Sequence, residues 1–97
     1  MNSLICKAIQ EIKLLKFYYD GYYRKVEPHT YGISKNGSEM LVAFQIRGGS
    51  KEGKVHYWKQ FKVDKIEKII ILDETFEKPR PNYVRGDKKI KLIYCEL

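Results

Sequence analysis

Residues 16–46, KFYYDGYYRKVEPHTYGISKNGSEMLVAFQI, decide the fold class of this 97-residue chain. Strand-like segments flank Asp20-Gly21 and Asn36-Gly37. Asp20-Gly21 favours a tight hairpin turn, and Asn36-Gly37 is the stronger hairpin signal because both of its residues tolerate the positive φ of a type I′ turn. The stretch therefore predicts consecutive antiparallel strands over 16–19, 22–34 and 40–46. Pro28 lies within the second strand, where its missing N–H restricts it to an edge or a bulge.

On the N-terminal side of this stretch, residues 3–15 predict an amphipathic helix. Its apolar residues recur at steps of three and four: Leu4, Ile5, Ala8, Ile9, Ile12 and Leu15. Ser3 is the expected N-cap, since its hydroxyl can accept a hydrogen bond from a free backbone N–H of the first turn. A helix of this length is marginal alone, so we expect its apolar stripe to pack on another element.

On the C-terminal side, the pattern predicts a flexible loop over 47–53 and further strands at 54–63, 66–72 and 90–94. Two prolines hold the segment 76–83 extended. Several short strands joined by turns are typical of a small barrel or a strongly curved sheet. We therefore expect one mainly β (α+β) domain over 1–97. It comprises the helix at 3–15, barrel strands over about 16–72, and an extended tail over 76–97 that contains the last strand.

The composition indicates a single small basic domain. The chain has 19 Lys and Arg against 12 Asp and Glu, a formal net charge of +7, and 43% of its residues are hydrophobic. This hydrophobic content excludes wholesale disorder, while the basic excess favours polyanionic partners. The longest apolar run, 69–72, is too short to cross a bilayer, and the N-terminus lacks a signal-peptide pattern. We therefore expect a cytoplasmic protein with no membrane partner.

No arrangement of residues in the sequence predicts catalysis, a cofactor or a metal site. His29 and His56 are far apart and lack an acidic or cysteine partner at ligand spacing, and we expect both on strand surfaces. The GGSKEG loop at 48–53 joins two strands, whereas a phosphate-binding loop opens a helix. The two cysteines do not make a disulfide framework, and Cys6 is interpreted as a small packed side chain. We predict a protein that is not an enzyme.

Rings and cations are interleaved along two of the predicted strands, 22–34 and 54–63. This mixture suits flat anionic ligands, because a base stacks on a ring while Lys or Arg meets the phosphate. These strands and their expected neighbours in the sheet give the candidate binding residues His29, Tyr31, Gln45, Arg47 and Trp58. For any single ring, an equally good interpretation is that it fills the core while the lysines are solvated.

A series of motifs runs through most of the chain, from about residue 4 to residue 70. They are IxxAIxxxxxL from Ile5, F-x-Y at Phe17, R-x-V-E-P at Arg24, L-V-A-F at Leu41 and K-x-F-x-V-D-K-I from Lys59 to Ile66. Together they resemble the WYL domain, the small barrel that bacteria usually append to helix-turn-helix transcription regulators. The resemblance implies an N-terminal helix packed on an Sm-like (Src-homology-3-like) barrel of five to six strands.

The resemblance also implies ligand sensing, because WYL domains are thought to bind nucleotides or nucleic acid on a basic and aromatic surface. Carried over position by position, the binding residues are Tyr19, Arg24, Lys59 and Lys65. The triplet that names the family aligns with residues 39–41, Glu-Met-Leu, so its two aromatic residues are absent. Lysine stands where the family's closing motif has arginine, which keeps the charge but loses the planar two-pronged geometry.

The expected function is a non-enzymatic regulatory module that binds nucleic acid or a nucleotide-like anion and acts through an effector protein. The alternative is a protein–protein interaction or homodimerisation module without a nucleic-acid ligand. Strand edges and the apolar stripe of the helix are surfaces that a second copy can cover. Neither hypothesis requires a cofactor.

Overall fold

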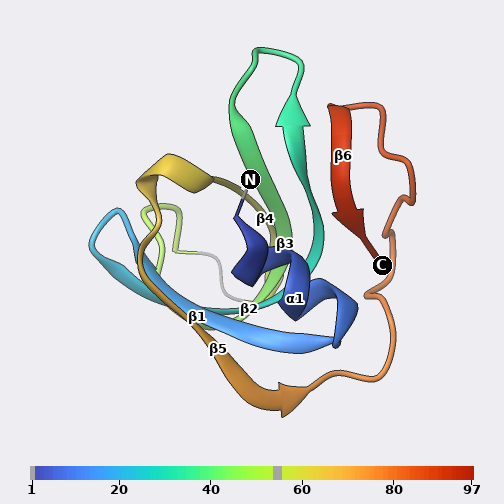
Figure 1. Ribbon diagram of the computed structural model, residues 1–97. Helices are drawn as coiled ribbons and strands as arrows, with labels where there is room; N and C mark the ends of the chain where they lie inside the picture. The colour runs from blue at the N-terminus through green and yellow to red at the C-terminus, as the bar shows by residue number, and fades with distance from the viewer. Residues whose placement is uncertain (1, 54–55) are drawn as a thin grey trace.

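The computed structural model describes residues 2–53 and 56–97 and shows a mainly β domain with one N-terminal helix (Figure 1). Its elements are α1 (Ser3–Gln10), β1 (Lys13–Tyr19), β2 (Tyr22–Ser34), β3 (Glu39–Gly48), β4 (Tyr57–Lys62), the 3₁₀ turn η1 (Val63–Lys65), β5 (Glu67–Thr75) and β6 (Ile90–Glu96). The mainly β class is therefore confirmed. Lys54 and Val55, predicted to begin the fourth strand, lie outside the described residues.

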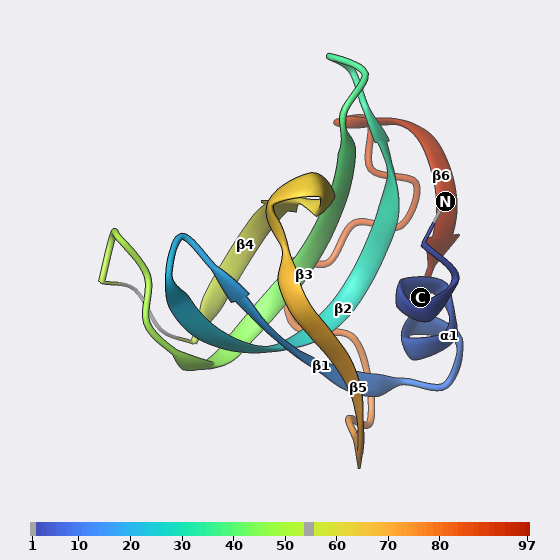
Figure 2. The ribbon, with the colours of Figure 1, turned by 60° about the vertical axis from the view of Figure 1, so that its left-hand side comes forward.

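The six strands form one antiparallel sheet in the order β4-β3-β2-β1-β5, with β6 pairing the second half of β2. The sheet is strongly curved, and α1 lies beside β6 at one end of it (Figure 2). The expected closed barrel is wrong, because β4 and β5 stay at opposite ends of the strand order and do not pair within the described residues. Helix α1 contacts β1, β2, β5 and β6, and its buried Ile5, Ala8 and Ile9 pack in the core of the open sheet.

The first predicted hairpin turn has the expected conformation, and the second has a different one. Asp20 and Gly21 both have positive φ, at 53° and 78°. Between β2 and β3 only Gly37 is left-handed, with φ of 87°, and its N–H donates to the carbonyl of Ser34. The connection is therefore a longer loop in place of a two-residue type I′ turn. In it the Asn36 side chain accepts a hydrogen bond from the backbone of Ser38.

The predicted helix over 3–15 is too long, because the chain leaves the helix after Gln10 and begins β1 at Lys13. Ile12 takes a left-handed conformation with φ of 50°, which ends the helical path. Leu14 and Leu15 are both buried although they are adjacent, so they do not share one helical stripe. The N-cap is Asn2, whose side chain accepts hydrogen bonds from the first turn, and not Ser3.

The core lies between α1 and the inner face of the curved sheet. It contains Ile5, Ala8, Ile9, Leu15, Phe17, Val26, Tyr31, Leu41, Ala43 and Phe61. Beside it, Cys6 of α1 and Cys95 of β6 form a disulfide bond, which corrects the interpretation of Cys6 as a free packed side chain. The two cysteines are 89 positions apart in sequence, and they meet because β6 returns to β2 next to the helix.

Candidate anion-binding site

Four of the nine predicted binding residues meet at the end of the inner face that is far from α1. Arg24 of β2, Gln45 of β3 and Lys59 of β4 are 3%, 0% and 8% exposed, and Tyr19 at the end of β1 completes the group. We call these four residues the inner cluster. Arg24, Gln45 and Lys59 face inward because they alternate with outward-facing neighbours along their strands. The motif resemblance had singled out the other member, Tyr19, together with Arg24 and Lys59.

Arg24 is held by hydrogen bonds on one side and by aromatic rings around it. Its Nη1 donates to Gln45 Oε1 at 3.1 Å, and its Nη2 donates to the carbonyl of Tyr19 at 3.2 Å. The guanidinium carbon lies 5.5 to 5.7 Å from three ring centroids, those of Tyr19, Tyr22 and Phe61. These contacts fix the orientation of a planar cation and contribute cation–π stabilisation.

The charge of Arg24 is not neutralised by a carboxylate. Within the part of the chain that the structure describes, Arg24 makes no ion pair, and its Nε is buried without a hydrogen-bond partner. Burial lowers the pKa of the guanidinium, and the more distant carboxylates of Asp20 and Glu52 only partly oppose this effect. Arginine nevertheless stays protonated in proteins, so the inner cluster contains an unpaired buried cation.

Lys59 adds a second cation at the same end of the inner face. Its Nζ lies 3.3 Å from Ser50 Oγ and 3.7 Å from a carboxylate oxygen of Glu52, an exposed residue of the β3–β4 loop. The turn between β1 and β2 lies beside this loop in both views (Figures 1 and 2), and Gly49 donates from its backbone to Tyr23. The cations are therefore held between two loops that join strands, as ligand-binding residues often are.

The other five predicted residues do not join the inner cluster. Tyr31 belongs to the core, where burial and a hydrogen bond to Glu39 raise its pKa to about 12. Arg47 and Lys65 are exposed, the first near the end of β3 and the second in η1. The remaining two, His29 and Trp58, lie together on the outer face of the sheet with ring centroids 4.6 Å apart.

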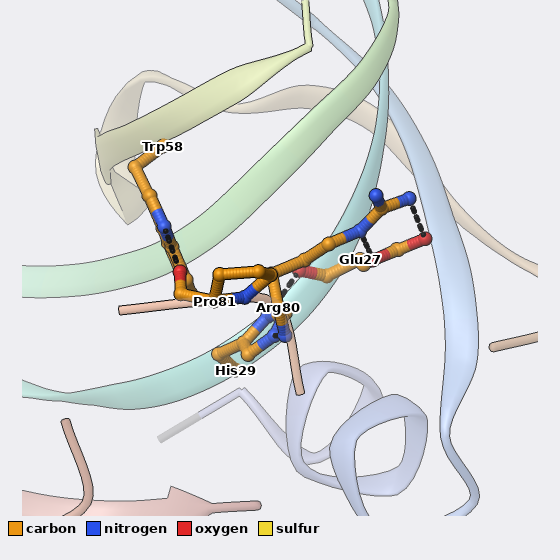
Figure 3. A network of polar contacts seen from close by, with 5 residues as sticks. All are labelled: Glu27, His29, Trp58, Arg80 and Pro81. Carbon is orange, nitrogen blue, oxygen red and sulfur yellow. Dashed lines mark hydrogen bonds and ion pairs between the residues drawn. The ribbon is translucent and has the colours of Figure 1, made fainter. Parts of the chain in front are cut away.

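A network that the sequence did not reveal fastens the segment after β5 to this outer face (Figure 3). Arg80 Nε and Nη2 donate to the two carboxylate oxygens of Glu27 at 2.7 and 2.9 Å. The Arg80 backbone N–H donates to His29 Nε2 at 3.1 Å, and Trp58 Nε1 donates to the carbonyl of Pro81 at 3.0 Å. A glutamate inside an otherwise buried strand was the available signal, because a buried carboxylate requires a partner.

His29 is completely buried in this network, so its expected place on a strand surface is wrong. Its Nδ1 lies 2.8 Å from the carbonyl of Glu27 and donates to it, since Nε2 accepts from Arg80. Burial lowers the pKa of His29, and only weaker interactions with Glu27 oppose that effect. The imidazole is therefore neutral and structural, with both nitrogens engaged.

The same outer face carries a groove of about 460 Å³, within the size range of ligand pockets. One wall is formed by strand residues of β2, β3 and β4, and the other by the segment 82–89. The lining residues are Thr30, Val42, Glu52, Trp58, Lys59, Gln60, Asn82, Tyr83, Val84, Asp87 and Lys89. Lys59, a member of the inner cluster, thus also lines the groove, and so does Glu52, whose carboxylate lies 3.7 Å from the Lys59 Nζ.

Neither a family model, nor a curated protein, nor a solved structure matches the chain. Over residues 2–53 and 56–97, no three His, Cys, Asp or Glu side chains gather as a metal site would require. No helix in the same residues combines the length and the apolar character needed to cross a membrane.

Proposed function

We propose that this chain is a non-catalytic binding module for a phosphate-bearing anion of the nucleotide type, with the inner cluster as its phosphate site. The observation that carries the proposal is the unpaired Arg24, buried with a free Nε. Buried charges in proteins are paired or they bind a ligand, since removing a lone charge from water is costly. An incoming phosphate supplies the missing negative charge.

The chemistry of the inner cluster suits phosphate better than it suits a simple carboxylate. Arg24 offers a planar fork, Lys59 a point charge, and Gln45 a polar side chain between them, so several oxygens of one group can be met at once. The surrounding rings exclude water, which strengthens these electrostatic contacts. A net charge of +7 attracts such anions from a distance.

The motifs shared with WYL domains support the same proposal. Tyr19, Arg24 and Lys59 are motif-matched positions, and all three belong to the inner cluster. We further propose that the open curved sheet is a relative of the Sm-like barrel and that ligand binding regulates an effector protein.

A titration of the inner cluster tests this function. AMP and a labelled single-stranded oligonucleotide are each added to the full chain at 50, 150 and 500 mM NaCl, which distinguishes a free nucleotide from a nucleic-acid backbone. The affinity for AMP or for the oligonucleotide, whichever binds, should fall as the NaCl concentration rises. Arg24→Gln should weaken binding at least tenfold, whereas Arg47→Gln removes the same charge from an exposed site and should change it less than threefold. Equal binding by both variants would overturn the proposal.

A second candidate function is homodimerisation, because β5 forms an open edge of the sheet. Ile70 on this strand is 46% exposed, and unpaired edges with apolar residues favour association. Light scattering across a concentration series measures the mass directly. A dimer that Ile70→Lys dissociates would support this function, and a monomer at every concentration would exclude it.

A further inference from the structure

We propose that the outer groove binds the planar base of a nucleotide whose phosphate occupies the inner cluster, so that the ligand is a mononucleotide. The proposal rests on the function proposed above and deepens it by naming the second half of the ligand. The groove volume of about 460 Å³ is suited to a group of nucleoside size. The segment 82–89, for which the sequence predicted no role, then serves as one wall of a binding site.

Two aromatic rings in the groove are already arranged for a flat ligand. Trp58 of β4 and Tyr83 of the 82–89 segment have ring planes only 16° apart and centroids separated by 6.5 Å. His29 contacts both rings, with centroid distances of 4.6 and 5.2 Å. A base can stack on such a ring whichever base it is, because every base has a π-face.

Hydrogen bonds fix both rings before any ligand arrives. Trp58 Nε1 donates to the carbonyl of Pro81, and the Tyr83 hydroxyl donates to the carbonyl of Leu97 at 3.0 Å. The ion pair of Arg80 with Glu27 fastens the chain just before the 82–89 wall. A groove with walls held in this way loses little conformational entropy when it binds, which favours affinity.

Polar groups at the groove provide contacts for the edge of a base. The exposed side chains of Gln60 and Asn82 contribute two amides, groups that both donate and accept hydrogen bonds. Amide side chains are suited to the donor and acceptor pattern of a nucleobase edge. The mixed charges of the lining, from Glu52, Lys59, Asp87 and Lys89, do not favour a long polyanion there.

Lys59 connects the two halves of the proposed site. It lines the groove, and its Nζ lies at the inner cluster beside Ser50. Because β4 is the edge strand of the sheet, a ligand can lie across it, with the base on one face and the phosphate reaching the other. The exposed carboxylate of Glu52, which also lines the groove, disfavours the continuing phosphate backbone of a polymer.

The single tryptophan of the chain provides a direct measurement, because Trp58 itself lines the groove. Adenosine and AMP are titrated separately into the full-length protein while tryptophan fluorescence is recorded. Both should change the fluorescence saturably, and AMP should bind at least tenfold more tightly. Tyr83→Leu should weaken both ligands at least fivefold. The matched control, Tyr18→Leu, alters a 40% exposed tyrosine of β1 that lies outside both the groove lining and the inner cluster, and it should leave both affinities unchanged.

The outcomes separate the two proposals. If adenosine leaves the fluorescence unchanged, and AMP affinity depends on Arg24 but not on Tyr83, the groove proposal is overturned while the anion-binding function stands. If AMP affinity depends on Tyr83 but is the same in Arg24→Gln, the phosphate site is wrong. No response to either ligand contradicts both. Should Tyr83→Leu fail to fold by circular dichroism, Gln60→Ala on the exposed surface of β4 replaces it, with a threefold loss expected.

Discussion

Two arginines on opposite faces of the sheet have different surroundings. On the outer face, Arg80 donates to both carboxylate oxygens of Glu27, and this bond raises the pKa of the guanidinium. On the inner face, Arg24 is more deeply buried, yet it makes no ion pair in the described residues and one of its donors is unsatisfied. Arg24 is the more completely buried of the two, so its burial costs more free energy. Within the described residues it is nevertheless the arginine without a carboxylate partner.

This difference separates a structural cation from one available to a ligand. Arg80 and Glu27 neutralise each other and hold the 76–83 segment against the sheet, so the pair stabilises the fold and has no net charge to attract a ligand. Arg24 carries an unbalanced charge, which opposes folding in the absence of a ligand and favours anion binding.

The largest expected effect comes from the disulfide bond that joins α1 to β6. Cys6→Ala/Cys95→Ala removes a cross-link between residues 89 positions apart and should lower the free energy of unfolding by about 4 kcal/mol. Urea unfolding monitored by circular dichroism measures this loss. The affinity for AMP of the fraction that stays folded should not change, since the inner cluster is at the other end of the sheet. A stability change below about 1 kcal/mol would contradict the expectation.

A smaller loss should follow when the structural ion pair is broken. Arg80→Met leaves the Glu27 carboxylate buried without its partner and should lower the free energy of unfolding by about 2–3 kcal/mol. Adding Glu27→Gln to this variant removes the unpaired charge, so the double variant should recover part of the loss. Urea unfolding of the wild type, Arg80→Met, Glu27→Gln and the double variant gives the coupling energy. An additive double variant would show that the pair does not act as a unit.

The residues of the inner cluster were easier to find from the sequence than the outer network, because the motif resemblance had singled out Tyr19, Arg24 and Lys59. Alternation along β2 indicates which side of the strand Arg24 occupies, and the turns at 20–21 and 36–37 indicate its neighbours. Arg80 lies in a segment without regular periodicity, 53 positions from Glu27, so no local pattern joins them. The predicted helix was too long for a similar reason. Leu14 and Leu15 are adjacent and both buried, which suits a strand, and their burial depends on partners that are distant in the sequence.

The buried histidine of the outer network should make stability depend on pH. Burial holds the pKa of His29 in the folded protein below 6.5, so between that lowered value and 6.5 the unfolded chain binds more protons. The contribution of a neutral His29 is complete above pH 6.5 and is lost as pH falls through the folded pKa. Its charged neighbours are Glu27 and Arg80, and the rings of Trp58, Phe76 and Tyr83 surround it.

Thermal unfolding between pH 7.5 and 5 measures this dependence. The wild type should lose stability across the range, and His29→Gln, which does not titrate, should give a flatter profile from a lower starting value. His56 is exposed, so His56→Gln is the matched control and should preserve the wild-type slope. Identical slopes in wild type and His29→Gln would show that His29 does not cause the pH dependence.

The smallest stability change is expected at Arg24, and it is the sharpest test of the comparison. Arg24→Met keeps the length of the side chain and its packing on Tyr19 and Phe61, and it removes a buried unpaired charge at the expense of two hydrogen bonds. These effects oppose each other, so the free energy of unfolding should change by less than about 1 kcal/mol in either direction. Urea unfolding without ligand measures this value beside Arg80→Met.

Addition of AMP then separates the two arginines further. A ligand that binds only the folded state raises stability, by about 2.7 kcal/mol at a concentration one hundred times its dissociation constant. Arg80→Met should keep most of that increase, although its starting stability is lower, whereas Arg24→Met should lose it. A loss of 2–3 kcal/mol in ligand-free Arg24→Met would instead make Arg24 a structural residue like Arg80, because its charge would then be stabilised by the fold itself.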